Sequence, residues 1–274
     1  MGEDPSGDEM PATKLTRRLR DHDWLAALIE LAIVVGGILL ALRVSNWNQE
    51  RQDRDRGARY AERLGAELVS DTISMDEATH FWQQVSAYGQ SAMAYSERGT
   101  LADAEPWKTV LAYYQAGQLF PFELEDTTFL EMRDSASLAL IADESLRKRI
   151  ADYYRMNGAG LRGDIMHHRP EYRQQIRGLT PWAIQEYIWS HCFRQGVGVS
   201  QELLDCPTPI SESEATALLE TYRSSDTLLP NLRIWMSTVR VSQIIIEGMR
   251  RDASKLADDF VKASGGRSAE IAHK

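Results

Sequence analysis

An uninterrupted apolar run near the N-terminus is the clearest feature of the hydrophobic pattern. Residues 24–42 read WLAALIELAIVVGGILLAL, and Glu30 is the only charged residue among them. At about 1.5 Å per residue, a helix of this length spans roughly 28 Å, which is close to the thickness of the hydrocarbon core of a bilayer. The pattern therefore predicts one transmembrane helix over residues 24–42.

Two other interpretations of this run explain it less well. A cleavable secretory signal has a shorter apolar region that ends in a small-x-small site, and residues 41–44, Ala-Leu-Arg-Val, offer none. A core helix of a soluble protein is hard to reconcile with a run that is apolar on every face. We expect the run to be retained, with Trp24 and Trp47 at the membrane boundaries and Arg43 extending its head toward lipid phosphates.

Small residues and one carboxyl share a face of this predicted helix. Glu30, Val34, Gly37 and Ala41 follow the spacing i, i+4, i+7, i+11. Small side chains allow a second helix to approach closely, and a partner can offset the cost of an ionisable group in lipid. The face predicts a contact with another transmembrane helix, from a second copy or from a partner protein. A protonated Glu30 and a Glu30 that reaches the headgroups are the alternatives.

Beyond the membrane the chain keeps helical spacing and becomes strongly charged. Apolar residues recur every three or four positions from Ala61 to Val85, and again from Leu229 to about Ala263. No stretch alternates cleanly with period two, so we predict an all-α fold. In this fold the N-terminal transmembrane helix continues into a helical bundle-like domain, and the last helix of the domain packs along the first.

Local signals divide the chain further. Gly99 marks the end of the long first helix, Pro106 and Asp143 mark helix starts, and Ser211 with Glu214 has the spacing of a capping box. Residues 192–209, which contain several glycines and prolines, predict an irregular loop. The expected organisation is a disordered and basic tail over 1–23, the span over 24–42, a helical extramembrane domain over 43–263 and a flexible tail over 264–274.

Composition and charge limit the classes of partner that the protein can bind. The 274 residues are 43% hydrophobic and 26% charged, which suits one folded domain with additional segments. A formal charge of −9 argues against a nucleic-acid clamp, because phosphate binding needs a local excess of Lys and Arg. The expected partners are therefore the lipid bilayer and another transmembrane helix, with no nucleic acid and no cofactor.

The basic residues near the span favour one orientation. Four precede it in a compact cluster, whereas the five that follow it are interleaved with acidic residues, as along a soluble helix. We expect a single-pass protein of the inner membrane, with a cytoplasmic N-terminus and a periplasmic C-terminal domain. In that compartment Cys192 and Cys206 can form a disulfide that closes a loop of about 15 residues. Two buried, reduced cysteines are the alternative.

The N-terminal region resembles a known family. Residues 29–31, 34–42 and 46–51 resemble the G-E-I, V-x-G-I-L-I-A-L and N-x-W-N-E signature of a family of uncharacterised bacterial single-pass membrane proteins. Residues 128–154, from Thr-Phe-Leu-Glu-Met to Tyr-Tyr, look like a second block of that family. Ile29 departs from the pattern, which has glycine there. The resemblance implies a membrane-anchored and mostly helical domain, and it carries over no catalytic residue.

Candidates for catalysis and metal binding are weak. Asp164, His168 and Glu171, beside His167, offer oxygen and nitrogen ligands at helical spacing, but Pro170 interrupts the helix that would align them. His191 next to Cys192 suggests a nucleophile and its base, although adjacent side chains seldom point together. The glycines of 158–163 lack the strand and the Gly-Lys-Ser/Thr element of a phosphate loop.

Nine aromatic residues recur at helical spacing and allow two interpretations. We expect them to fill a core, although they could also line a ligand pocket. They are Trp82, Trp107, Tyr113, Tyr114, Tyr153, Tyr154, Trp182, Trp189 and Trp235.

These patterns favour a non-enzymatic interaction or assembly module anchored in the membrane. The alternatives are an extracytoplasmic sensor of a small ligand and, with less support, a metal-dependent hydrolase around His167 and His168. The sequence predicts no catalytic residue.

Overall fold

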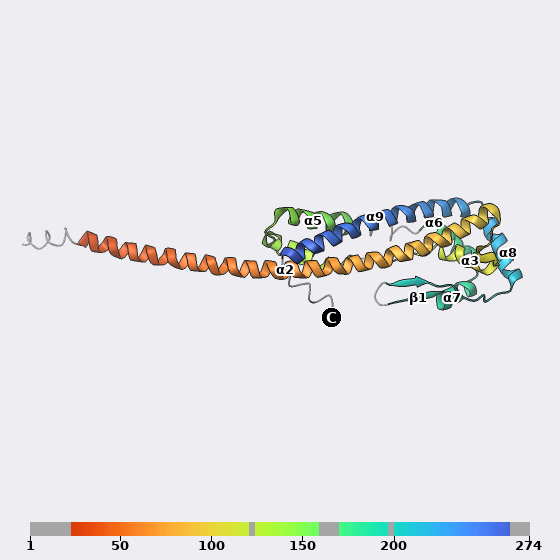
Figure 1. The fold of residues 1–274 in the computed structure, drawn as a ribbon, viewed down its shortest axis with the longest axis horizontal. Helices are drawn as coiled ribbons and strands as arrows, with labels where there is room; N and C mark the ends of the chain where they lie inside the picture. The colour runs from red at the N-terminus through yellow and green to blue at the C-terminus, as the bar shows by residue number, and fades with distance from the viewer. Residues whose placement is uncertain (1–22, 121–123, 159–169, 197–199, 264–274) are drawn as a thin grey trace, which may run out of the picture. The chain divides into compact units, whose positions relative to one another are not determined.

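The structure is a computed structural model, and it describes residues 23–120, 124–158, 170–196 and 200–263 (Figure 1). The chain divides into two compact units, Met1–Arg56 and Gly57–Lys274. Helices account for most of the described residues, so the all-α class predicted from the sequence is confirmed, as is the long apolar N-terminal helix that leads into a helical domain.

The first unit contributes the beginning of one very long helix, α2, which runs from Asp23 to Arg98. The predicted span over 24–42 lies wholly within α2, and every one of its residues is exposed. Leucine and alanine, which are good helix formers, make up ten of the nineteen residues of this span and support the helix locally. The two adjacent glycines, Gly36 and Gly37, do not interrupt it.

The second unit contains the rest of α2 and nine further helical segments in its described part. These are η1 (Ala102–Ala104), α3 (Pro106–Gln115), α4 (Thr127–Asp134), η2 (Ser137–Leu140), α5 (Glu144–Gly158), α6 (Glu171–Leu179), α7 (Trp182–His191), α8 (Glu212–Arg223) and α9 (Leu228–Ala263), of which η1 and η2 are short 3-10 turns.

Several predicted helix starts are confirmed. Pro106 occupies the first turn of α3, where its missing N–H is not needed. The Asp143 carboxylate accepts the backbone N–H of Ser145 at 2.8 Å, at the start of α5. Ser211 and Glu214 form the complete capping box of α8, because each side chain accepts the backbone N–H of the other residue.

Helices α2 and α9 lie side by side and antiparallel, as Figure 1 shows. Contacts along the pair join residues whose numbers fall on α2 as they rise on α9. The contacts are Glu97 with Arg233, Ser86 with Gln243, Asp76 with Arg250 and Gly65 with Phe260. The prediction that the last helix packs along the first is therefore confirmed.

The core of the second unit lies between these two helices and the shorter ones. Helix α5 packs on α9, whereas α3 packs on α8 and α6. Large side chains with essentially no exposure fill the interior: Leu64, Leu68, Met75, Phe81, Trp82, Leu111, Tyr113, Tyr114, Phe120, Tyr172, Tyr222 and Phe260. Removal of this apolar area from water is the main force that holds the helices together.

A small hairpin corrects part of the sequence prediction. Strand β1 (Phe193–Gln195) pairs antiparallel with β2 (Gln201–Leu203), with Phe193 opposite Leu203. The sequence predicted an irregular loop over residues 192–209 and no strand anywhere. Three-residue strands are too short to produce a period-two pattern that can be recognised in the sequence.

Candidate functional site

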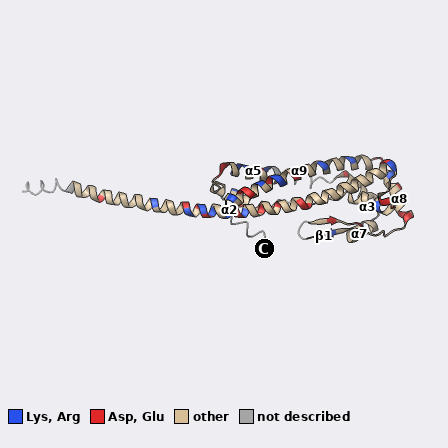
Figure 2. Cartoon of the chain, viewed as in Figure 1, with Lys and Arg blue, Asp and Glu red and all other residues tan. Residues whose placement is uncertain are grey.

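The apolar part of α2 is the first candidate site. Its most apolar 18-residue window has a mean hydropathy of 2.6, and none of that window is buried within the protein. By length and composition this is the one helix of the described residues that is long and apolar enough to cross a membrane. Figure 2 shows few charged residues along its N-terminal part and many along the rest of the chain. The helix is thus compatible with a single-pass membrane protein.

The predicted contact face lies open on this helix. Glu30, Val34, Gly37 and Ala41 are all exposed, and Val34 shows 53% of its surface. A Cβ atom added at Gly37 would meet nothing within 4 Å. Among the described residues, therefore, no side chain of this chain packs close to Gly37, and a second helix has room to approach.

The predicted boundary residues are equally exposed. Trp24 shows 58% of its surface and Trp47 shows 61%, and Arg43 is also exposed. Exposed indole rings leave a large apolar area that another apolar medium can cover. Their positions near the two ends of the apolar stretch suit a membrane–water boundary.

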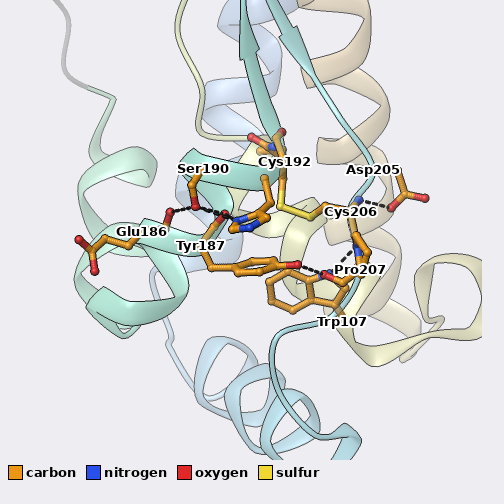
Figure 3. The surroundings of a disulfide bond; sticks show 10 residues. Trp107, Glu186, Tyr187, Ser190, Cys192, Asp205, Cys206 and Pro207 are labelled. Carbon is orange, nitrogen blue, oxygen red and sulfur yellow. Dashed lines mark hydrogen bonds between the residues drawn. A yellow bond between two sulfur atoms is a disulfide. The ribbon is translucent and has the colours of Figure 1, made fainter.

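Cys192 and Cys206 form a disulfide in the second unit (Figure 3). Their Cα atoms lie 5.2 Å apart, and both residues are buried. The alternative of two reduced cysteines is therefore wrong for this structure. The bond closes the base of the β1–β2 hairpin, since Cys192 directly precedes β1 and Cys206 follows β2 by three residues.

Hydrogen bonds from α3 fix this disulfide to the core. The Trp107 indole N–H donates to the carbonyl oxygen of Cys206 at 3.0 Å, and the Gln115 amide donates to the carbonyl oxygen of Cys192 at 2.8 Å. On the outer side, the Tyr187 hydroxyl donates to the carbonyl oxygen of Pro207 at 2.9 Å (Figure 3). The hairpin is thus attached to two helices through its backbone.

The hypothesis of a His191–Cys192 nucleophile is wrong, because the Cys192 sulfur is bonded to Cys206. A disulfide sulfur has no thiolate to act as a nucleophile. The His191 ring instead stacks on Tyr187, with 4.2 Å between the ring centroids, and its Nδ1 lies 2.8 Å from the hydroxyl of Ser190.

The candidate metal ligands fall mostly outside the described residues. This is so for Asp164, His167 and His168, and for most of the glycine-rich stretch 158–163. Glu171 begins α6 and is exposed, directly after Pro170. Within the described ranges, no group of three His, Cys, Asp or Glu residues is arranged to hold a metal ion.

Most of the nine aromatic residues fill the core, as the sequence predicted. Seven of them are buried: Trp82, Trp107, Tyr113, Tyr114, Tyr153, Tyr154 and Trp235. Trp189 is half-buried, and Trp182 is the exception, because it begins α7 and 68% of its surface is exposed. A cavity of about 240 Å³ beside α3 is lined by Trp107 and by none of the other eight.

A buried carboxylate that the sequence did not single out joins three elements. The Asp71 side chain is 1% exposed, and it accepts the backbone N–H of Glu125 and the hydroxyl of Tyr153, each at 2.8 Å. Burial raises the pKa of Asp71 to about 6, and the hydrogen bonds only partly oppose that rise. The only signal in the sequence is an Asp within an otherwise apolar stripe of the helix.

Comparison of the chain with protein-family models, with curated proteins and with solved structures finds no match. The family resemblance of the N-terminal region therefore stays a prediction.

Proposed function

We propose that this chain is a single-pass membrane protein that acts as a non-enzymatic interaction or assembly module. In this proposal the transmembrane helix associates with another helix through Glu30, Val34, Gly37 and Ala41. The observation that carries the proposal is the open glycine on that face, where a Cβ would meet nothing within 4 Å. Small residues in a bilayer favour close helix packing, because van der Waals contact and interhelical hydrogen bonds replace the hydrophobic effect there.

The disulfide supports a location of the second unit outside the cytoplasm. Such bonds persist in oxidising environments and are rare in a reducing cytosol. The bond between Cys192 and Cys206 therefore supports the proposal that the second unit lies outside the cytoplasm. The compact basic cluster before the span supports a cytoplasmic N-terminus, which gives an inner-membrane protein with a periplasmic domain.

Crosslinking within the membrane tests the contact face. A cysteine placed at Ala41 reports the proximity of a second helix, whether that helix belongs to another copy or to a partner. We expect Gly37→Leu to lower the yield of crosslinked product about tenfold, which corresponds to roughly 1.4 kcal/mol of association free energy.

Gly36→Leu is the matched control. Gly36 is equally open, with nothing within 4 Å of an added Cβ, but it lies on a different face of the helix. Its substitution should leave the crosslinked yield unchanged. Equal yields from wild type, Gly37→Leu and Gly36→Leu would eliminate the proposed face.

A polar cavity favours a second candidate, the sensor of a small ligand. It has a volume of about 390 Å³ and is lined by residues of α2 and α9: Asp76, Thr79, Gln83, Arg240, Gln243, Glu247 and Arg250. A ligand held there would contact α2, the helix that also contains the apolar stretch. Mass spectrometry of the protein released from mild detergent tests this candidate, and the absence of any bound small molecule counts against it.

A further inference from the structure

Two arginines on α6 are placed in an unusual environment for positive charges. Arg173 and Arg177 lie one helical turn apart, so their side chains share a face. Both are half-buried, beside the fully buried Tyr172 and Ile176. Helix α6 is packed between α3 and α9, which limits the access of water to this face.

Arg173 has hydrogen-bond partners, but no described residue provides a counter-charge. Its Nη1 donates to the carbonyl oxygen of Gly117 and to the side-chain oxygen of Gln118, the latter at 3.1 Å. These acceptors are neutral, so they satisfy N–H groups without balancing the charge. Burial and repulsion by Arg177 lower the pKa of Arg173 to about 10, far below the ordinary value for a guanidinium.

In the part of the chain that the structure describes, Arg177 has neither a counter-charge nor a full set of hydrogen bonds. Its guanidinium lies 5.3 Å from the centroid of the Trp189 ring and 5.9 Å from that of the Tyr114 ring. Its Nη2 is buried, and no acceptor among the described residues lies within hydrogen-bond distance of it. The aromatic faces attract the cation, but they do not replace an oxygen acceptor for that N–H group.

Other arginines of the second unit, by contrast, form ion pairs with carboxylates. Arg149 pairs with Asp259 at 2.8 Å, and Arg233 pairs with Glu97 at 2.7 Å. Among the described residues, neither Arg173 nor Arg177 forms an ion pair with any Asp or Glu. Two adjacent charges that are removed from water and left unbalanced are costly, and buried charges in proteins are normally paired.

We propose that Arg173 and Arg177 form a binding site for an oxyanion, the carboxylate or phosphate group of a small molecule. The planar fork of a guanidinium fits both groups, and a second arginine one turn away doubles the charge that meets them. Both side chains are half-buried and so keep part of their surface in contact with solvent, and the rings of Tyr114 and Trp189 lie beside the Arg177 guanidinium. This site is independent of the proposed membrane contact.

Thermal unfolding of the full-length protein in detergent micelles tests the site. Sodium phosphate and sodium acetate are titrated separately, with sodium chloride holding the ionic strength constant. We expect one of the two anions to raise Tm in a saturable manner, because a ligand that binds only the folded state stabilises it. The more effective anion identifies the class of ligand.

The variants Arg173→Met and Arg177→Met should each weaken the response about tenfold or more, as expected for the loss of a charged hydrogen-bond donor. Arg59→Met is the matched control, because Arg59 is exposed on α2 and its removal changes the net charge equally. It should retain the full response. Without anion, Arg177→Met should unfold at a higher Tm than wild type, since it removes an unbalanced charge.

A wild-type Tm that responds to neither anion beyond the chloride control overturns the proposal, and this result requires no variant to fold. An equal loss of response in Arg59→Met also overturns it. A lower Tm of Arg177→Met without anion, together with an unresponsive wild type, identifies Arg177 as a packing residue between the two rings. Near-ultraviolet circular dichroism verifies that each variant retains the packed core.

Discussion

Two stretches of the same helix, residues 24–42 and 57–98 of α2, differ in nearly everything except their backbone. In the first stretch every residue is exposed, and in the second an apolar stripe is buried at intervals of three and four. Leu39 shows 58% of its surface, whereas Leu68 shows none. Helical hydrogen bonds are satisfied locally in both stretches, so the backbone alone does not distinguish them.

The difference shows what each stretch needs from its surroundings. The second stretch finds apolar partners within the chain, such as Trp235 of α9 against Trp82, and this surface is removed from water on folding. The first stretch has apolar residues on every face and no described residue packed against them. A bilayer is a medium in which such a surface is stable.

The largest expected effect comes from one substitution made in both stretches. Leu68→Ala should lower the free energy of unfolding of the second unit by about 2–5 kcal/mol, because it removes buried methyl groups and leaves a cavity. Leu39→Ala should change it by less than about 0.5 kcal/mol, because 58% of the Leu39 surface is exposed. Urea unfolding in detergent micelles, followed by near-ultraviolet circular dichroism, measures both values.

The matched pair sharpens the comparison because the chemical change is identical. A large loss of stability in Leu39→Ala would show that the apolar stretch packs on the second unit. An effect of Leu68→Ala below about 1 kcal/mol would contradict the packing of α2 in the core.

Removal of the disulfide should have the next largest effect. The double variant Cys192→Ser/Cys206→Ser should lose about 3 kcal/mol of stability, as expected when a loop of about 15 residues is no longer closed in the unfolded chain. The comparison of wild type with and without a reducing agent provides the control, and it should give a loss of similar size. Unchanged unfolding in both experiments would show that the bond does not constrain the unfolded chain.

The buried carboxylate predicts a pH dependence of the second unit. The pKa of Asp71 rises from 3.8 to about 6 on folding, so the folded state holds this proton more tightly than the unfolded state does. Between these two values stability falls as the pH rises, and the full cost of at most about 3 kcal/mol is present above about pH 6. Acidification from neutral pH should therefore raise the stability that depends on Asp71.

The variant Asp71→Asn tests whether Asp71 causes the predicted fall in stability as the pH rises. An amide can still accept the backbone N–H of Glu125 and can donate to the Tyr153 oxygen, so the geometry can be kept without the charge. The variant should show a flatter dependence of Tm on pH between about pH 4 and pH 7 than wild type does. Parallel curves would contradict the assignment to Asp71, and they would leave Glu67, whose pKa burial also raises, as the titrating group.

The sequence predicted those features that depend on neighbours along the chain. The hydrophobic period predicted α2 and α9, and the Ser211–Glu214 box predicted the start of α8, because helix periodicity and capping act within one or two turns. The hairpin was missed because its pairing joins short segments that carry no period of their own. Trp182 was assigned to the core from its spacing, although whether a helix face is covered depends on elements far away in the sequence.

The candidate sites also fall into those that the sequence predicts and those that depend on the tertiary structure. Residues 24–42, with their small-residue face, can be recognised from composition and spacing alone, because membrane insertion depends on one continuous apolar segment. For Cys192 and Cys206 the sequence allowed both a bridge and two free thiols, and their separation in space decided between them.

What the sequence determined by itself is the helical class, the apolar stretch and its position in the chain, since all three follow from local periodicity and composition. Only the tertiary structure decided the antiparallel partner of α2, the disulfide, and the environments of Asp71, Arg173 and Arg177. The physical reason is that burial and pairing depend on distances between residues that are remote in sequence. A carboxyl or guanidinium group changes its properties only when packing removes the water around it.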